Sequence, residues 1–255
     1  MVLSDCEIRK KIDSVDLITN YDDKKLRGAS YELRMGNVYY DLTESSNRIE
    51  LKKDEKVIIK PGHYVVLITK ESVNIPKDLI AKITSKGSLF SIGLSPVATC
   101  ADPGFSGQLG IITQNISNKF IELPQDEGIA KIDFSILSGK VSHDYKGQHG
   151  YQTNIWPIKY HLQKSYDDVK NDRRVKTEDE EAYVVLPYST SRIIKKIISN
   201  QRITFIFLLC IVFITTLLNT YLLTGFNSTF LINIVVNIAC GIVVWLITKY
   251  MEPKV

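Results

Sequence analysis

The side chains best suited to metal catalysis are few, and they do not form a zinc site. Four histidines and four cysteines are scattered along the chain: His63, His143, His149, His161, Cys6, Cys100, Cys210 and Cys240. None of them shows zinc-ligand spacing, and the H-x-E and P-C-x-x-C motifs with which some zinc enzymes activate water do not occur. A lysine-containing phosphate loop and a G-x-S-x-G serine motif are also missing from the sequence. We therefore expect no zinc and no metal-ligating side chains.

The distribution of charge divides the chain into two parts. Charged residues make up 24% of the 255 residues, yet none lies between Ile203 and Thr248. This stretch contains two apolar runs, residues 203–224 and 229–248, and each is long enough to cross a bilayer core of roughly 30 Å as a helix. Residues 225–228 (GFNS) join them and favour a turn. We therefore expect a transmembrane helical hairpin.

Basic residues predict the orientation of this hairpin. Lys and Arg precede the first span and follow the second, whereas the connecting turn is uncharged. Because such residues remain on the cytoplasmic side, we expect a two-pass protein of the inner or plasma membrane. Its N-terminal domain and its C-terminal tail, residues 249–255, would then both be cytoplasmic. Three asparagines within the spans either pack inside the hairpin or form a seam between protomers, and the sequence leaves this open: Asn219, Asn233 and Asn237.

Residues 161–202 are expected to connect the hairpin to an N-terminal domain. Residues 164–181 are dense in charge and lack Gly and Pro, which is typical of an exposed helix or linker. Residues 191–202 (SRIIKKIISNQR) place isoleucines on one helical face and basic residues on the other. This pattern predicts an amphipathic juxtamembrane helix at an anionic membrane surface. The net charge of +4 is too small to indicate a nucleic-acid partner.

The first 160 residues show the pattern of an all-β domain. A short helix is expected at residues 4–12, and apolar and polar residues then alternate with period two. The expected strands are separated by turn residues such as Pro61-Gly62 and Asp102-Pro103-Gly104, and they fall at residues 56–59, 64–69, 79–84, 109–113 and 129–136. Many short strands at this spacing predict a β-barrel or sandwich. The absence of strand–helix alternation argues against a dinucleotide-binding α/β domain.

Several motifs in this domain carry a family resemblance. They are Gly28–Gly36 (GASYELRMG), Pro61-Gly62, Val73–Leu79, Ser85–Leu94 (SKGSLFSIGL), Ala101–Gly107 (ADPGFSG), Asn115, Ile129-Ala130 and His149–Gln152. In order and spacing they resemble the dCTP deaminase/dUTPase superfamily, from about Leu3 to Pro157. The resemblance implies a mainly β, barrel-like fold that assembles as a homotrimer or a multiple of it. It also implies deoxynucleoside triphosphates bound between subunits, with Mg²⁺ on their phosphates.

The residues that would perform deamination in that family are changed. The glutamate that serves as acid and base corresponds to Ile112, and no Asp or Glu lies between Asp102 and Glu122. A hydrocarbon side chain cannot transfer a proton. The family's arginine and paired serines correspond to Lys86, Gly87 and Ser88, and a second arginine corresponds to Ser91. We therefore expect no deaminase activity.

The remaining positions still suit nucleotide binding. By resemblance, Asp102 contacts the deoxyribose, or orients the attacking water if the chain is a dUTPase; otherwise its Asp-Pro-Gly segment is a plain turn. The expected nucleotide-binding residues are Lys86, Gly87, Ser88, Asp102, Gly104, Gln114, Tyr151 and Gln152. Support for a dUTPase is thin, since Glu32 and Lys131 replace its usual Asp and Gln and its Gly-rich tail is missing.

Two classes of function follow. The first is a membrane-anchored nucleotide sensor or effector built on a degenerate deaminase-like domain, with the hairpin as its output, by analogy with bacterial anti-phage effectors. Its ligand would be a deoxynucleotide or a cyclic nucleotide. The second is a membrane-anchored dCTP deaminase or dUTPase of pyrimidine deoxynucleotide metabolism. The sequence leaves open the nucleotide, the sign of any regulation, and whether the hairpin forms a pore.

Overall fold

The computed structural model describes residues 1–143, 145, 155–225, 235, 238–239 and 241–243. The chain forms two units, Met1–Tyr160 and His161–Val255.

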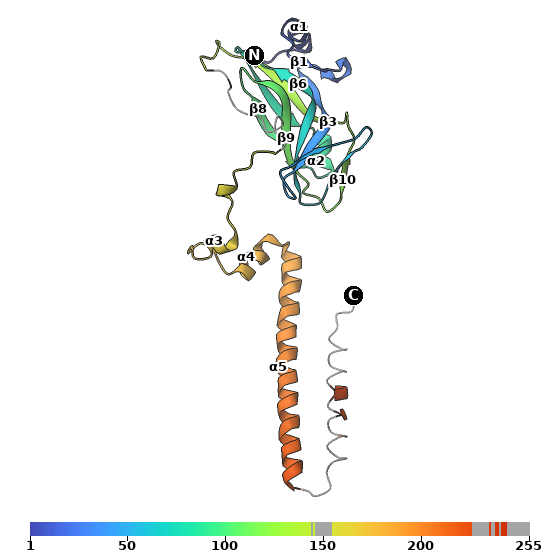
Figure 1. Cartoon of the computed structure of the whole chain (residues 1–255), viewed down its shortest axis with the longest axis vertical. Helices are drawn as coiled ribbons and strands as arrows, with labels where there is room; N and C mark the ends of the chain where they lie inside the picture. Colours follow the sequence, from blue (N-terminus) through green and yellow to red (C-terminus); the bar gives the residue numbers. More distant parts are fainter. Residues whose placement is uncertain (144, 146–154, 226–234, 236–237, 240, 244–255) are drawn as a thin grey trace. The chain divides into compact units, whose positions relative to one another are not determined.

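The first unit is mainly β (Figure 1). It begins with helix α1 (Asp5–Val15), and two short helices follow later, η1 (Asp23–Lys25) and α2 (Gly87–Ser91). The strands are β1 (Ile18–Thr19), β2 (Leu26–Arg27), β3 (Ser30–Asp41), β4 (Arg48–Glu50), β5 (Val57–Ile59), β6 (Tyr64–Asn74), β7 (Leu79–Ser85), β8 (Ala98–Ala101), β9 (Ser106–Gln114), β10 (Ile121–Leu123) and β11 (Gly128–Ile136). The five strands expected from the sequence and the N-terminal helix are confirmed.

Antiparallel pairing joins these strands into one large sheet and one small sheet. The nine-stranded sheet has the order β1-β6-β3-β11-β7-β8, with β2 and β4 beside β3 and with β9 beside β6. The second sheet pairs β10 with β5. The large sheet curls, and its register shifts where β3 meets β6 and where β6 meets β9. Such irregularities increase local twist and bend a strand, so they help the sheet to close around a core.

β3 is the longest strand of this unit and was not expected as a strand from the sequence. Tyr31, Leu33 and Met35 are fully buried, and the residues between them are only partly buried. The alternation is therefore present, but polar and charged residues occupy the alternate positions and weaken the apolar signal. The motif that resembles the deaminase family thus forms the central strand of the sheet.

One large apolar cluster fills the inside of the curled sheet. Its most buried large side chains include Tyr31, Leu33, Phe105 and Phe134. Helix α1 adds Ile8 and Ile12 to this cluster. Burying apolar side chains of this size contributes about 1.5–3 kcal/mol each, so the core stabilises the sheet that carries the candidate site.

A charged group is buried beside this core. The Glu71 side chain is fully buried, and its carboxylate accepts hydrogen bonds from the Tyr31 hydroxyl (3.0 Å), the Arg34 Nε (2.6 Å) and the Arg34 backbone N–H (2.8 Å). The Arg34 guanidinium also donates to the Asn20 carbonyl at 2.6 Å. A buried carboxylate is stable only when it is paired in this way. Tyr31 and Arg34 of the family-like motif therefore have a structural role.

A short segment, residues 155–160, is fastened to the outer face of the large sheet. The Trp156 ring packs on Tyr40 with centroids 5.4 Å apart, and it joins a small apolar cluster with Val66 and Ile68. The Trp156 backbone N–H donates to the Ser46 carbonyl at 2.8 Å. Residues far beyond the last strand are thus tied to the β3–β6 region.

The second unit is helical. After η3 (Tyr160–Leu162) come α3 (Tyr166–Val169), α4 (Glu178–Val185) and the long α5 (Tyr188–Gly225). No Gly or Pro lies between Pro187 and Gly225, so the expected juxtamembrane helix is not separate but forms the first turns of α5.

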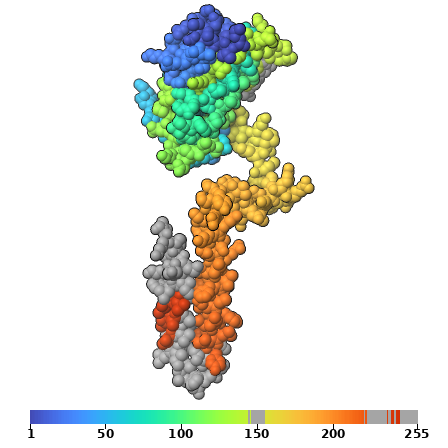
Figure 2. Space-filling model, turned by 180° about the vertical axis from the view of Figure 1, so that it is seen from behind, coloured from blue at the N-terminus to red at the C-terminus, as the bar shows by residue number. Residues whose placement is uncertain are grey.

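Within α5, one segment is long and apolar enough to cross a membrane. It covers Tyr188–Asn219, 32 residues, and its apolar window is not buried in the described structure. Large side chains such as Phe205, Phe213 and Leu217 are exposed along it. The atoms of α5 are orange in Figure 2. The second expected span, residues 229–248, lies largely outside the described residues, and its few described positions are helical. Asn233 and Asn237 also lie outside them.

Candidate functional site

Lys86 marks one end of the candidate site, where β7 passes into helix α2. Its carbonyl accepts hydrogen bonds from the N–H groups of Leu89 (3.1 Å) and Phe90 (3.4 Å). Leu89 is buried and anchors the helix, whereas Gly87 and Ser88 are exposed on the first turn. Gly87 and Ser88 therefore lie together at the surface, next to Lys86, whose side chain is only 17% exposed.

The amine of Lys86 is held by carboxylates. It lies 3.3 Å from Glu32 Oε2 and 3.5 Å from Glu127 Oε1. Lys25 donates to Glu32 Oε1 at 2.7 Å. Two lysines and two glutamates thus form a network with no net charge. Because Lys86 lacks the planar fork of an arginine, it offers a phosphate only a point charge that these carboxylates already attract.

Glu32 is confined within this network. Partial burial of its carboxyl group opposes ionisation, but hydrogen bonds from Lys25 and Lys86 outweigh it, so the pKa of Glu32 lies below its usual value. Across the ladder, a Cβ at Gly128 would lie 2.2 Å from Glu32 Oε1. A larger residue at position 128 would therefore require the Glu32 side chain to shift.

Asp102 begins a tight turn after β8. The Asp102 carbonyl accepts a hydrogen bond from the Phe105 N–H at 3.0 Å, and Gly104 has φ +89°. With Pro103 at the second position and a positive φ at the third, this is a type II turn. The Asp102 side chain is exposed. The plain-turn interpretation therefore accounts for the backbone of this segment and leaves the carboxylate available.

Within one chain, the predicted binding residues lie in two separate places. Ala101 pairs with Ala81 at one end of the β7–β8 ladder, and Lys86 follows the other end. Asp102 and Lys86 are therefore about six residues apart along the strand direction, or about 20 Å at 3.3 Å per residue. Gln114 lies on the Lys86 side, because its N–H donates to the Ser95 Oγ at 2.8 Å. Gly104 lies with Asp102.

Tyr145, which precedes the remaining predicted residues in the sequence, contacts the Asp102 turn. The Tyr145 N–H donates to the Pro103 carbonyl at 3.0 Å, and its ring packs edge-on against Phe105 with centroids 5.6 Å apart. Tyr151 and Gln152, expected as nucleotide ligands, lie outside the described residues.

Ile112 lies on the outward face of β9. It pairs with Val66 of β6, and its side chain is 45% exposed, whereas its neighbours Ile111 and Thr113 are buried. The isoleucine is thus not part of the core. Its position is accessible to a ligand and carries no group that can transfer a proton.

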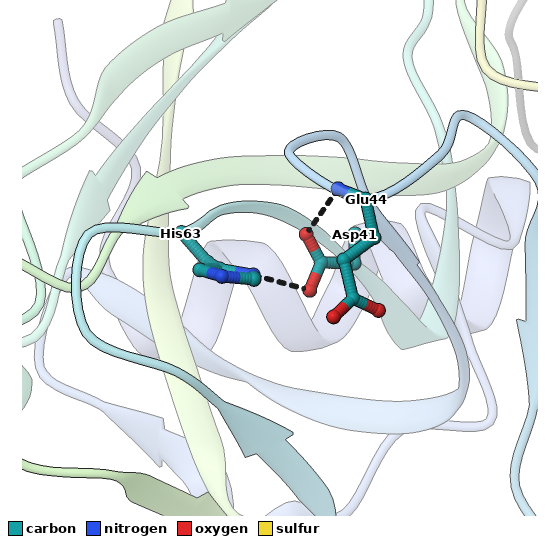
Figure 3. A group of neighbouring side chains, drawn as sticks. All are labelled: Asp41, Glu44 and His63. Carbon is teal, nitrogen blue, oxygen red and sulfur yellow. Dashed lines mark hydrogen bonds and ion pairs between the residues drawn. The ribbon is translucent and has the colours of Figure 1, made fainter.

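One group of potential metal ligands lies together among the described residues, and it was not expected from the sequence. Asp41, Glu44 and His63 are drawn in Figure 3, where His63 Nδ1 lies 2.8 Å from Asp41 Oδ2. Asp41 Oδ1 also accepts the N–H groups of Thr43 (3.1 Å) and Glu44 (3.3 Å). The Glu44 carboxylate is paired with Lys60. These bonds give the group a structural role in fastening the turn after β3, at the opposite end of that strand from Glu32.

A family model described as dCTP deaminase-like matches residues 2–137, more than half of the chain. The chain belongs to the dCTP deaminase-like family. Its deaminase-like domain is 30% identical to the dCTP deaminase of Pyrococcus furiosus over 155 residues, which cover 61% of this chain and 95% of that protein. It is 31% identical to the dUMP-forming dCTP deaminase of Dictyoglomus thermophilum, with 64% and 91% covered.

Solved structures are more distant. The 2'-deoxycytidine 5'-triphosphate deaminase of Agrobacterium tumefaciens is 18% identical with a TM-score of 0.45, and the match covers 53% of this chain but only 48% of that one. A mutant dUTPase from phage phi11 of S. aureus, which coordinates a structural Mg(II) ion, is 15% identical with a TM-score of 0.34, and 51% and 90% are covered.

Sequence reasoning identified the motifs but not the contacts between them. The ion pairs of Lys86 with Glu32 and Glu127 join residues far apart in the chain. No pattern in the sequence indicated a lysine partner for either glutamate. Only the antiparallel register of β3 with β11 brings them to one place.

Proposed function

We propose that this dCTP deaminase-like domain binds a nucleotide without deaminating it, and that it acts as a membrane-anchored sensor. The observation that carries this proposal is Ile112, which occupies the family's acid–base position on an accessible strand face. Lys86 and Ser91 replace two arginines of the same site. A nucleotide pocket that keeps Asp102 but lacks a proton-transfer group favours binding over turnover.

The nucleotide would bind between subunits. Asp102 and Gly104 lie at one end of the β7–β8 ladder, and Lys86, Ser88 and Gln114 lie at the other. One chain therefore does not bring both halves to a single small ligand, whereas a second copy can supply the missing half. This separation supports a homo-oligomer, a trimer or a multiple of it. Mg²⁺ would be bound through the phosphates of the nucleotide rather than by a protein cluster.

The anchor would be the apolar part of α5, together with the second apolar run to form a two-pass hairpin. The length and exposed apolar surface of α5 support one span. The lysines and arginines that flank the two runs support cytoplasmic placement of the domain and the C-terminus. If nucleotide binding changes how the hairpins of neighbouring copies pack, the ligand must bind the two arrangements with different affinity. A role in bacterial anti-phage signalling is part of this proposal, by analogy of architecture.

The test is a nucleotide panel on the full chain in detergent. It contains dCTP, dUTP, dTTP, ATP and cyclic di- and oligonucleotides, and it records both the thermal shift and product formation. We expect a ligand-dependent rise in melting temperature, as for any ligand that binds the folded state, and no dUTP or dUMP. Deamination or hydrolysis that Asp102→Asn abolishes would overturn the sensor and establish a membrane-anchored dCTP deaminase or dUTPase.

A complementation experiment tests the placement of the site. Lys86→Glu and Asp102→Asn each disable one half of it, so each variant alone should bind poorly. When the two variants are co-expressed, mixed oligomers contain some sites made of two unaltered halves. Binding that reappears only in the mixture supports a site between subunits. Equal loss in the mixture and in the single variants would place both halves in one chain and contradict the proposal.

A further inference from the structure

The surface around Lys86 carries fixed negative charge among its cations. Lys86 contacts Glu32 and Glu127, and Lys25 contacts Glu32. Lys131 stands directly opposite Glu32 in the ladder between β11 and β3, with its side chain exposed. Residues opposite each other in such a ladder have Cβ atoms about 4.5–5.5 Å apart. Three lysines and two glutamates therefore give this site a net charge of only +1.

We propose that Glu32 and Glu127 determine specificity at this site by lowering its affinity for nucleoside triphosphates relative to nucleoside monophosphates. The inference rests on the proposed function, in which the Lys86 end of the domain meets the phosphates. It goes beyond that function in naming the residues that set the preference between nucleotides of different phosphate charge.

The two glutamates act in different ways because they are held differently. Glu32 is only 20% exposed and is held by both Lys25 and Lys86. It therefore remains in place when a ligand arrives and repels the phosphate oxygens. Glu127 is 44% exposed, so its carboxylate can turn into solvent. The structure thus assigns the larger effect to Glu32.

Repulsion by a fixed carboxylate grows with the charge of the ligand. A phosphate monoester carries a charge of about −1.5 to −2 at neutral pH, and a triphosphate carries roughly two charges more. At about 7 Å and an effective dielectric constant of about 60, two additional unit charges change the affinity on the order of tenfold. Screening reduces this effect at high salt, because the Debye length at 0.1 M is only about 10 Å.

The experiment measures binding of dCMP, dUMP, dCTP and dUTP to the full chain in detergent at low ionic strength. It compares the unaltered protein with Glu32→Gln, Glu127→Gln and Glu122→Gln. Glu122 lies on β10, where it pairs with Lys56, so it provides the same change of charge in an ion pair that does not include Lys86. The melting temperature of each variant without ligand shows whether it is folded. If Glu32→Gln does not fold, Glu127→Gln still tests the inference.

We expect neutralisation of the two glutamates to shift the preference of the site towards triphosphates. Glu32→Gln should strengthen triphosphate binding on the order of tenfold relative to monophosphate binding, Glu127→Gln less, and Glu122→Gln not at all. Added Mg²⁺ or salt should narrow the difference, since both reduce the effective charge of the triphosphate. Equal effects of Glu32→Gln on both ligand classes, or none, would overturn this inference alone. Failure of every variant to bind any nucleotide would instead overturn the proposed function.

Discussion

Removing the charge of Glu71 should destabilise the deaminase-like domain far more than removing a surface charge. Its carboxylate is fully buried and accepts three hydrogen bonds, all from Tyr31 and Arg34. In Glu71→Gln the amide N–H₂ group would face a donor, and Arg34, only 11% exposed, would lose its closest counter-charge. The other carboxylates near Arg34 are more distant: Asp126 lies 3.6 Å and Asp22 3.8 Å from Arg34 Nη1.

Breaking a buried ion pair by removing one partner costs about 3–5 kcal/mol. The two distant carboxylates retain part of the attraction, so we expect about 3 kcal/mol for Glu71→Gln. That is a large fraction of the roughly 5–15 kcal/mol by which domains are stable. Tyr31→Phe should cost about 1–3 kcal/mol, since it leaves the Asp22 N–H without its 2.8 Å acceptor and removes one donor to Glu71.

Urea unfolding, followed by the fluorescence of Trp156, measures these costs. The chain has two tryptophans, and a Trp245→Phe background makes Trp156 the only reporter. The matched control is Glu122→Gln, whose exposed pair with Lys56 should contribute less than about 1 kcal/mol. The Glu71→Gln/Tyr31→Phe double variant should lose less stability than the sum of the losses in the two single variants. A cost of Glu71→Gln no larger than that of the control would refute the structural role of this pair.

Three further outcomes follow from the fold. Burial raises the pKa of the Tyr31 hydroxyl above its ordinary value of 10.0, so Tyr31 ionises at a lower pH in the unfolded chain than in the folded one. The free energy of unfolding, measured with urea, should therefore be unchanged below pH 10 and fall as the pH rises above it, and it should fall less in Tyr31→Phe. Trp156→Ala removes a half-buried ring and should lower the free energy of unfolding by about 2 kcal/mol. Tyr160→Phe loses one exposed hydrogen bond and should lower it by less than about 0.5 kcal/mol. Equal losses would contradict the packing of residues 155–160. Gly104→Ala must adopt φ +89° and should lower the melting temperature by an amount corresponding to about 1–2 kcal/mol, while Gly139→Ala, which has open space, should not.

The sequence by itself determined the composition of the two parts and the family. Period-two alternation located β5, β6, β7, β9 and β11, because each buries one face in a common core. The run without charge indicated α5, since a helix of that length and apolarity has few other environments. The motifs from Gly28 to Gly107 predicted the dCTP deaminase-like domain, and the family match over residues 2–137 confirms it. These features are local, so they can be read along the chain.

Only the tertiary structure decided which of those residues meet. It placed Tyr31 and Arg34 around the buried Glu71, and it set Glu32 and Glu127 on Lys86. It also showed that Asp102 and Lys86 lie at opposite ends of one ladder. Each of these contacts depends on strand register between segments that are distant in sequence. A shift of one residue would turn the side chains to the other face, and no local pattern of residue types specifies that register.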